Sequence, residues 1–258
     1  MASAEFDADL NACAALVEQA DAWRFRATMA APVAARRVLF PIYAFNVEVS
    51  RAPWVTSEPM IAAMRLQWWR DALDEIAARG VVRRHEVVTP LATVLDAEGA
   101  GLLDALVAAR DWDTGQAPFA DMAAFDAYIA ATSGNLVWAV ARALGGAEED
   151  VARDAGWALG LANWFLAVPA LEGAGRHPLP DTTPGAIAAL AGRGLDCLRR
   201  ARGQRGDVPL AAVLPVAGTG RILAQAAARP DMVRAGGLGP GPGRQSLALS
   251  WAALTGRW

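Results

Sequence analysis

The sequence predicts an all-α fold in which many helices pack into one large bundle. Apolar residues recur at three- and four-residue spacings along most of the 258 residues, and strand-like alternation is almost absent. Short segments with Gly or Pro, such as 112–120 and 172–184, separate these periodic stretches. The apolar stripes are broad, so most helices are expected to pack on two sides, as in a bundle rather than a solenoid.

Two helices are expected before residue 55. The first begins at Asp9 or Asn11, which are both good N-cap residues, and runs to about Ala30. The second begins at Pro32, because proline is favoured in the first helical turn, and Pro41 is expected to kink it.

The third helix has the clearest start signal. Ser57, Glu58 and Pro59 combine a capping residue with an N-terminal proline, and the apolar stripe then continues to about Ala78. The same periodicity predicts further helices over 87–97, 100–110, 121–144, 148–169, 184–202 and 217–228.

The C-terminal part is expected to divide into a linker and a tail helix. Residues 1–234 form one helical domain, 235–243 (AGGLGPGPG) a flexible linker, and 244–258 a separate helix. One stripe of that helix is apolar and consists of Leu247, Trp251, Leu254 and Trp258. The stripe is expected to pack on its own domain, with docking on a partner protein or on a membrane surface as alternatives.

Charge and composition restrict the function classes. The net charge of −3 and a pI near 5.5 argue against nucleic-acid binding, which usually needs a basic face. The N-terminal MASAEFDADL lacks an export signal, and no uncharged apolar run reaches the roughly 18 residues of a transmembrane segment. A cytoplasmic protein is therefore expected, and the ten Trp leave contact with the inner membrane open. Cys13 and Cys197 lack metal-ligand spacing.

Residues 156–180, GWALGLANWFLAVPALEGAGRHPLP, carry the most specific motif. Their spacing resembles a segment of the squalene and phytoene synthases that reads roughly G-x-A-x-Q-L-T-N-I-x-R-D-x-x-x-D-x-x-x-G-R-x-Y-L-P. Gly156, Asn163 and Arg176 fall on this pattern. The charged positions of the pattern fall instead on apolar residues, namely Leu166, Ala167, Ala170 and Leu171.

Residues 36–54, RRVLFPIYAFNVEVSRAPW, resemble a second block of the same family. Tyr43 and Phe45 match the block. Its three aspartate positions fall on residues that are not acidic, namely Ser50, Arg51 and Trp54. Together with a weaker match over 130–135, which includes Gly134, the resemblance extends over roughly residues 20–225.

This resemblance implies an isoprenoid-synthase fold with helices around a central apolar cavity. Enzymes of the family join two prenyl diphosphates, and Mg²⁺ held by aspartates on two facing helices offsets the charge of the departing pyrophosphate. The absent aspartates imply that the chain has no catalytic residue and no metal ligand. Mg²⁺ would be the cofactor only if the chain were an enzyme with a displaced metal site.

The resemblance also implies which residues line a vestigial cavity and contact a ligand: Tyr43, Phe45, Ser50, Arg51, Trp54, Gly134, Asn163, Ala167 and Arg176. Arg51 could bind a diphosphate directly, or it could be an exposed or ion-paired arginine. Tyr43 and Phe45 fit core packing as well as ligand contact, and Asn163 fits either a cavity wall or helix packing.

The stretch 64–71, MRLQWWRD, resembles a divergent branch of the family that includes a mitochondrial complex I assembly factor. That resemblance implies a non-catalytic lipid-binding or assembly protein, with a prenyl lipid or a membrane-complex subunit as its partner. Two alternatives remain open. The chain could be a Mg²⁺-dependent prenyl-diphosphate condensing transferase of the phytoene or squalene synthase type, or a helical protein whose cavity is filled by its own side chains.

Overall fold

The computed structural model describes residues 2–56, 58–204, 206–239 and 241–258, and it confirms the all-α prediction. Every regular element within these ranges is a helix. Most are α-helices, while η1 and η3 are short 3-10 helices and η2 is a π-helix. The elements are α1 (Ala2–Ala20), α2 (Ala22–Ala30), α3 (Val33–Arg51), α4 (Pro59–Ala77), α5 (Val88–Leu91), α6 (Ala97–Ala109), η1 (Arg110–Thr114), α7 (Met122–Ile129), η2 (Ala130–Gly134), α8 (Asn135–Ala143), α9 (Glu149–Gly173), α10 (Pro184–Gln204), α11 (Leu210–Val213), η3 (Leu214–Val216), α12 (Thr219–Ala228), α13 (Asp231–Ala235) and α14 (Pro242–Thr255).

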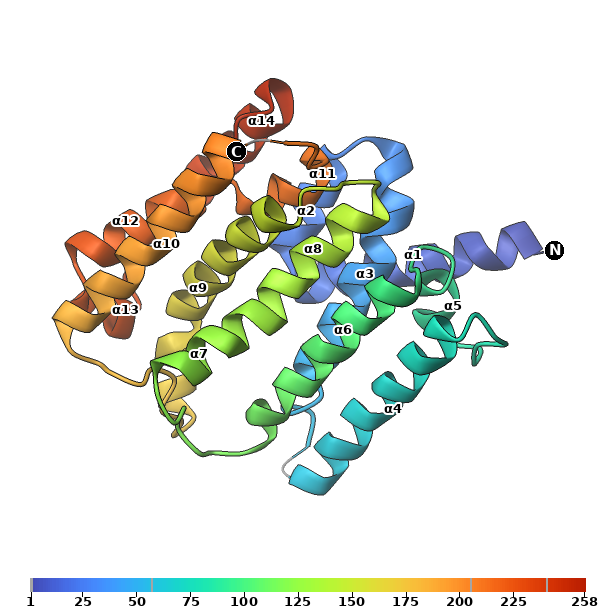
Figure 1. Ribbon diagram of the computed structural model, residues 1–258, viewed down its shortest axis with the longest axis horizontal. Coiled ribbons are helices and arrows are strands. Elements are labelled where there is room, and N and C mark those ends of the chain that lie inside the picture. Colours follow the sequence, from blue (N-terminus) through green and yellow to red (C-terminus); the bar gives the residue numbers. More distant parts are fainter. Residues whose placement is uncertain (1, 57, 205, 240) are drawn as a thin grey trace.

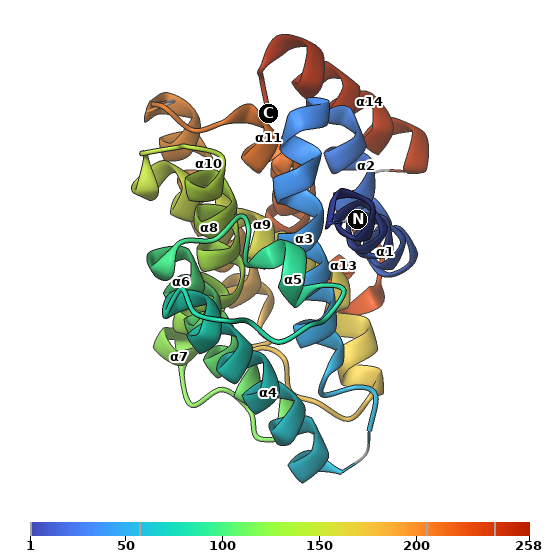
Figure 2. The ribbon, with the colours of Figure 1, turned by 90° about the vertical axis from the view of Figure 1, so that its right-hand side faces the viewer.

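The helices form two layers (Figures 1 and 2). α4, α6, α8, α9, α10 and α12 lie side by side in one layer, and each contacts the next. α1, α2 and α3 belong to the second layer, in which α3 contacts both α4 and α8. α14 lies at one end of the bundle against α2 and η3, and the connection from α3 to α4 lies at the opposite end.

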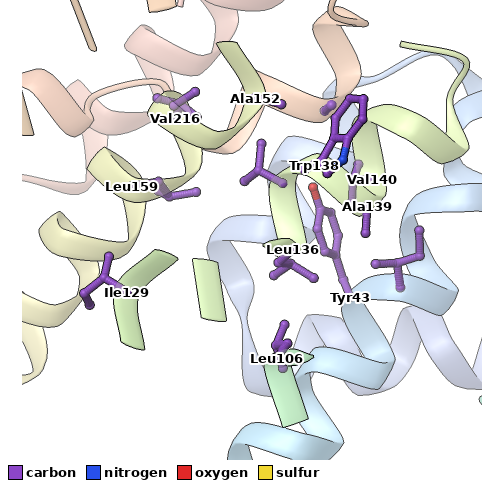
Figure 3. Packing of buried hydrophobic residues seen from close by; sticks show 14 of the residues in the cluster. Tyr43, Leu106, Ile129, Leu136, Trp138, Ala139, Val140, Ala152, Leu159 and Val216 are labelled. Carbon is purple, nitrogen blue, oxygen red and sulfur yellow. The ribbon is translucent and has the colours of Figure 1, made fainter. Parts of the chain in front are cut away.

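The core fills the space between the layers with apolar side chains. Figure 3 shows Tyr43 of α3 beside Leu136 and Trp138 of α8. All three side chains are almost fully buried, as are Leu106 of α6 and Leu159 of α9. Burying this apolar surface is the main source of the stability of such a bundle.

The closest approach between helices occurs where α9 meets η2. A Cβ atom added to Gly156 would lie 2.9 Å from the Cα of Gly134, and one added to Gly160 would lie 2.5 Å from the Cβ of Ser133. Side chains cannot normally approach this closely, so glycine is required at both positions of α9.

Two capping residues move helix boundaries away from the predicted ones. The first predicted helix is interrupted at Asp21, whose carboxylate accepts the backbone N–H of Arg24 at 2.9 Å and so caps α2. Asp96 caps α6 in the same way through the N–H of Gly99 at 2.8 Å. The helix predicted over 87–97 is consequently reduced to the four residues of α5.

The remaining boundaries follow the predicted pattern more closely. α4 begins at Pro59, and the predicted capping residue Ser57 lies outside the described residues. The predicted helix over 121–144 is continuous but contains the π-helix η2 in its middle. The short helices α11 and α13 were not expected, because four or five residues are too few to show a period.

The tail helix α14 packs on its own domain, as expected, but with the opposite face. Leu249 and Ala252 face the domain, at 6% and 0% exposure. The predicted stripe points outward instead, and its helical members are 58–85% exposed, namely Leu247, Trp251 and Leu254. Trp258 lies beyond the end of the helix and packs against the core. The prediction was wrong because α14 carries apolar residues on two faces, and periodicity does not indicate which face is buried.

One stretch of the described chain, Leu210–Ala228, is long and apolar enough to cross a membrane by length and composition alone. Pro215 and Gly218 divide it into α11, η3 and α12. Its most apolar window is 61% buried within the bundle. The core helices of many proteins meet the same criterion, so this stretch indicates no membrane span.

Candidate functional site

A pocket of about 370 Å³ lies between the two layers, where α3, η1, α7, η2 and α9 converge. Asp21 and Arg24, at the start of α2, close one side of it. The lining combines apolar residues such as Ile129 and Leu136 with many polar ones. The sequence predicted a central apolar cavity, whereas this pocket has a mixed lining.

The end of α3 forms the first wall of the pocket. Ser50 and Arg51 line it, and Trp54 follows in the connection to α4. The Ser50 hydroxyl donates to the backbone oxygen of Val47 at 3.0 Å. Arg51 is exposed and has no ion-pair partner among the described residues, and Trp54 is 52% exposed. This wall therefore presents one uncompensated cation and an open aromatic edge.

The facing wall is formed by α9. Asn163 and Ala167 line the pocket, one turn apart on the same face of the helix. Trp164 also contributes, and its indole N–H donates to the backbone oxygen of Pro178 at 2.9 Å. Ala170, at the next turn, is exposed to solvent. The α9 wall therefore offers an amide and a methyl group at the pocket, and no charge.

A network of three polar residues, the buried Asp113 and Tyr128 and the half-buried Arg110, forms the inner wall. Arg110 donates to the Asp113 carboxylate and to the Tyr128 hydroxyl, both at 2.9 Å. The Tyr128 hydroxyl lies 2.9–3.0 Å from both carboxylate oxygens of Asp113. The side chain of Asp113 is only 4% exposed. A buried charge needs such a partner, because an unpaired one would be strongly destabilising.

The pKa values of this network follow from its burial. Burial, reinforced by the nearby Asp113 charge, raises the pKa of the Tyr128 phenol well above its ordinary value. Burial alone would lower the pKa of Arg110, but Tyr128 and Asp113 together raise it above the ordinary value. Tyr128 is thus a neutral hydrogen-bonding group and Arg110 a permanent cation at neutral pH.

Several polar groups in the pocket lack partners. The Ser133 hydroxyl is buried without a hydrogen bond. The side-chain amides of Asn46 and Asn163 likewise make no hydrogen bond to any described residue, although both line the pocket. Unpaired buried polar groups are uncommon in proteins, and a pocket that contains them is suited to a ligand with its own hydrogen-bonding groups.

The structure gathers five of the nine predicted site residues around this pocket: Ser50, Arg51, Trp54, Asn163 and Ala167. The other four do not line it. Tyr43 is buried at 3% exposure with the Arg24 guanidinium 5.7 Å from its ring, and Phe45 packs edge-on against Trp69 at 5.3 Å. Core packing is therefore the correct interpretation of both aromatic residues.

Gly134 and Arg176 are the other two predicted residues that lie outside the lining of this pocket. Gly134 packs closely against Gly156 of α9 and lies behind the pocket wall. The Arg176 guanidinium stacks over the rings of Trp54 at 4.8 Å and Trp112 at 5.6 Å. Arg176 also donates to the backbone oxygen of Asp113, so it braces the pocket edge without lining the pocket.

The carboxylates of the pocket do not fit a magnesium ion. The pocket contains two, Asp21 and Asp113, and each is bonded to an arginine, Arg24 and Arg110 respectively. Mg²⁺ requires hard oxygen ligands that are free to coordinate it. Within the part of the chain that the structure describes, no three His, Cys, Asp or Glu side chains gather where they could hold a metal ion.

A helical bundle with a pocket between two facing helices is the architecture of the isoprenoid synthases, and solved structures of this class match it. A dehydrosqualene synthase in complex with a ligand has a TM-score of 0.74 and 13% identity, over 95% of both chains. The squalene synthase HpnC from Alicyclobacillus acidocaldarius has a TM-score of 0.72 and 18% identity, over 90% of this chain and 96% of the other. At these identities the match shows the fold alone.

The sequence comparison identifies the family. The model of the squalene/phytoene synthase family matches residues 17–184, and the chain belongs to that family. A Drosophila melanogaster relative, the NADH dehydrogenase (ubiquinone) complex I, assembly factor 6 homolog, is 44% identical over 64 residues. That match covers 24% of this chain and 19% of the relative, so only about a fifth of the relative is represented.

Proposed function

We propose that this chain is a non-catalytic member of the squalene/phytoene synthase family that binds one amphiphilic molecule, such as a prenyl lipid, without a metal. The observation that carries the proposal is the chemistry of the two facing helices. α3 presents Ser50 and Arg51 to the pocket, and α9 presents Asn163 and Ala167. None of these groups is a carboxylate, and a hydroxyl and an amide alone do not supply the charge that holds the metal ions of a departing pyrophosphate.

The pocket chemistry supports a single ligand with an apolar chain and a hydrogen-bonding head. Ile129, Leu136 and Leu171 supply apolar surface, while Ser133 and Asn163 supply unpaired polar groups. A volume of about 370 Å³ is near the lower end of the range of about 300–1000 Å³ typical of ligand pockets. The volume therefore favours one bound molecule over the two substrates of a condensing enzyme.

The electrostatic balance of the pocket supports a neutral or singly anionic head group. Three arginines and two aspartates line the pocket, and the aspartates are paired with Arg24 and Arg110. Arg51 is the remaining cation, and its guanidinium can accept a carboxylate or phosphate in a bidentate geometry. A ligand with more negative charge would need a metal ion or further cations.

A role in the assembly of a respiratory membrane complex is the second part of the proposal. Its support is the Drosophila relative named as a complex I assembly factor 6 homolog, which matches a quarter of this chain. A non-catalytic ligand-binding scaffold is compatible with such a role, since fold alone does not determine function. Co-purification of the full chain with complex I subunits tests this part independently of the pocket.

The pocket part is tested in two assays, binding of farnesoic acid as a singly anionic prenyl probe and turnover of farnesyl diphosphate, each with and without Mg²⁺. Trp54 and Trp164 line the pocket, so binding should change the tryptophan fluorescence. We expect binding that does not depend on Mg²⁺, and no release of pyrophosphate. Turnover on the order of 1 per second or faster would instead support a condensing enzyme. Arg51→Ala should weaken binding, while Arg65→Ala on the exposed face of α4 is the matched control.

A gain-of-function variant provides a second test. Replacing Ser50 and Arg51 with Asp would give α3 two carboxylates. The facing helix would still present Ala167 at the pocket and Ala170 to solvent, so we expect no Mg²⁺-dependent condensation. Activity in this double variant would show that the second set of metal ligands lies elsewhere, and it would support the enzymatic alternative.

A further inference from the structure

The outer face of α14 is apolar and uncovered. Leu247, Trp251 and Leu254 are 70%, 58% and 85% exposed, and no described residue packs over them. The helix is nevertheless held on the domain by Leu249 and Ala252 on its inner face. A second apolar face is therefore not needed for packing, and exposed apolar patches of this kind commonly mark interaction sites.

Two of the segments that meet at this end of the bundle contain no Asp or Glu. Residues 22–47, which include α2 and most of α3, have no Asp or Glu, and neither do residues 232–258. α14 contacts α2, and a groove of about 880 Å³ lies between the α2–α3 turn, α11 and α14. Met29 and Val33 at the edge of that groove are 44% and 72% exposed. Two acid-free segments that are distant in the sequence thus lie together.

The arginines of these segments give this end a positive charge, although the chain as a whole carries −3. Arg24 and Arg234 pair with Asp21 and Glu172, and five others are at least partly exposed: Arg26, Arg36, Arg37, Arg244 and Arg257. Asp7 of α1 pairs with Arg37 at 3.3 Å, with both side chains more than half exposed. Two exposed carboxylates, those of Glu148 and Asp207, lie in loops across the groove from the α2–α3 turn. Residues beside them in the sequence line the groove, namely Ala143, Leu144 and Pro209.

We propose that α14 and the α2–α3 turn together bind the surface of an anionic lipid bilayer. Leucine and tryptophan side chains on one helix face insert at the boundary between head groups and acyl chains, and flanking arginines are attracted to anionic lipids. Clusters of about 4–8 basic residues beside such a helix are typical of binding to anionic lipids. The tail contributes two basic residues, Arg244 and Arg257. The fold places three more beside them from the α2–α3 region, namely Arg26, Arg36 and Arg37.

Charge also argues against a second copy of the chain as the occupant. Two copies in a symmetric contact would bring the same arginine-rich faces together, and like charges at an interface are unfavourable. An anionic bilayer complements the face in both charge and apolar character. This surface lies at the end of the bundle opposite the α3–α4 connection that carries Trp54, so its function is separate from ligand entry at the pocket (Figure 1).

The proposal is tested by sedimenting the full chain with phosphatidylcholine vesicles that contain or lack phosphatidylglycerol. We expect binding to the anionic vesicles and a loss of about fivefold or more at about 0.5 M salt, where charges are strongly screened. The triple variant Leu247→Gln, Trp251→Gln, Leu254→Gln should lose binding to a similar extent. Because these side chains are exposed, its melting temperature should match that of the unaltered protein.

The matched control replaces exposed apolar residues of α4, which begins at the opposite end of the bundle. Met60→Gln and Met64→Gln alter side chains that are 76% and 67% exposed, and this variant should bind vesicles normally. If the triple variant fails to fold, Arg244→Glu with Arg257→Glu tests the same surface through charge.

Three results would overturn the proposal. The first is no binding to anionic vesicles at low salt, and the second is binding that the tail variants leave unchanged. The third is self-association in solution that the triple variant abolishes, without vesicle binding, since this would make the face an interface between copies.

Discussion

The two sides of the pocket differ in whether their polar groups are paired within the protein. The α3 and α9 walls carry Ser50, Arg51 and Ala167. Arg51 is the one charged residue of the three, and it has no ion-pair partner among the described residues. At the inner wall, Arg110, Asp113 and Tyr128 form a closed hydrogen-bonded network. The first side is open to a ligand, whereas the second is internally satisfied and rigid.

Under the proposed function, this difference lets the scaffold keep its pocket without a metal. The inner wall depends on partners within the protein, so it holds its shape whether or not a ligand is bound. The outer walls leave Asn46 and Asn163 without hydrogen-bond partners among the described residues, so those groups are available for binding. The following substitutions separate groups that stabilise the fold from groups that are available to a ligand.

The largest effect is expected for Asp113→Ala in the inner wall. The substitution leaves Arg110, whose side chain is only 20% exposed, without its carboxylate, and the cost should approach the roughly 3–5 kcal/mol of a fully buried pair. Thermal or denaturant unfolding measures this loss, and Asp111→Ala, which removes an exposed carboxylate two residues away, is the matched control. A loss below about 1 kcal/mol would mean that Arg110 reaches solvent and that the network is not closed.

Gly160→Ala should have the next largest effect, because it forces apart the α9 wall and the inner wall. The new Cβ would lie 2.5 Å from the Cβ of Ser133, and overpacking of this kind costs about 1–3 kcal/mol. Gly101→Ala on α6 is the control, since nothing lies within 4 Å of its added Cβ. In that exposed helix position the change should stabilise the protein by up to about 1 kcal/mol. Equal melting temperatures for the two variants would contradict the close contact.

Asp96→Ala tests a carboxylate–arginine pair outside the pocket and should cost about 1 kcal/mol at neutral pH through loss of the α6 cap. Bonds from Arg142 and from the N–H of Gly99 lower the pKa of Asp96 in the folded state. A lowered pKa means that this stabilisation is present above the ordinary value of 3.8 and is lost as the pH falls through the folded value. The free-energy difference between the variant and the unaltered protein should therefore shrink in acid, and a constant difference would contradict the assignment.

Ser133→Ala should have the smallest effect on stability, within about 0.5 kcal/mol, because its buried hydroxyl has no partner to lose. A ligand that uses this hydroxyl would bind roughly fivefold more weakly, which is the worth of one ordinary hydrogen bond. Thr28→Val is the matched control, since the Thr28 hydroxyl is also buried without a partner among the described residues and does not line the pocket. Unchanged affinity for the farnesoic acid probe would exclude Ser133 as a ligand contact.

The sequence predicted the long helices well, because each carries a sustained apolar period. α4 and α9 were both expected within a few residues of their observed bounds. The break at Asp21 was not expected, since the apolar stripe continues across it. In α14 the period was correct and the buried face was wrong, because the choice between two apolar faces depends on the neighbouring helices.

The candidate site was only half predictable for a similar reason. Ser50, Arg51, Trp54, Asn163 and Ala167 were identified because they occupy positions in two recognisable blocks. Tyr128 was missed because it belongs to a different helix from Arg110 and Asp113, and only the fold brings them together. The spacing of Arg110 and Asp113, three residues apart at a helix end, was the one available signal.

The π-helix η2 makes the pocket sensitive to the number of residues as well as to their identity. Its wider turn accommodates one residue more than an α-helical turn would. Deleting one residue from 130–134 would restore an ordinary α-helical turn, and α7 and α8 would keep their orientation because the π turn holds its extra residue within one full turn. Tyr128 and Leu136 would then stay in place, while the residues of the turn itself, including Ser133, would shift. The number of residues in this single turn therefore sets the local shape of the pocket wall, and changes in its length offer a direct route to pockets of different shape.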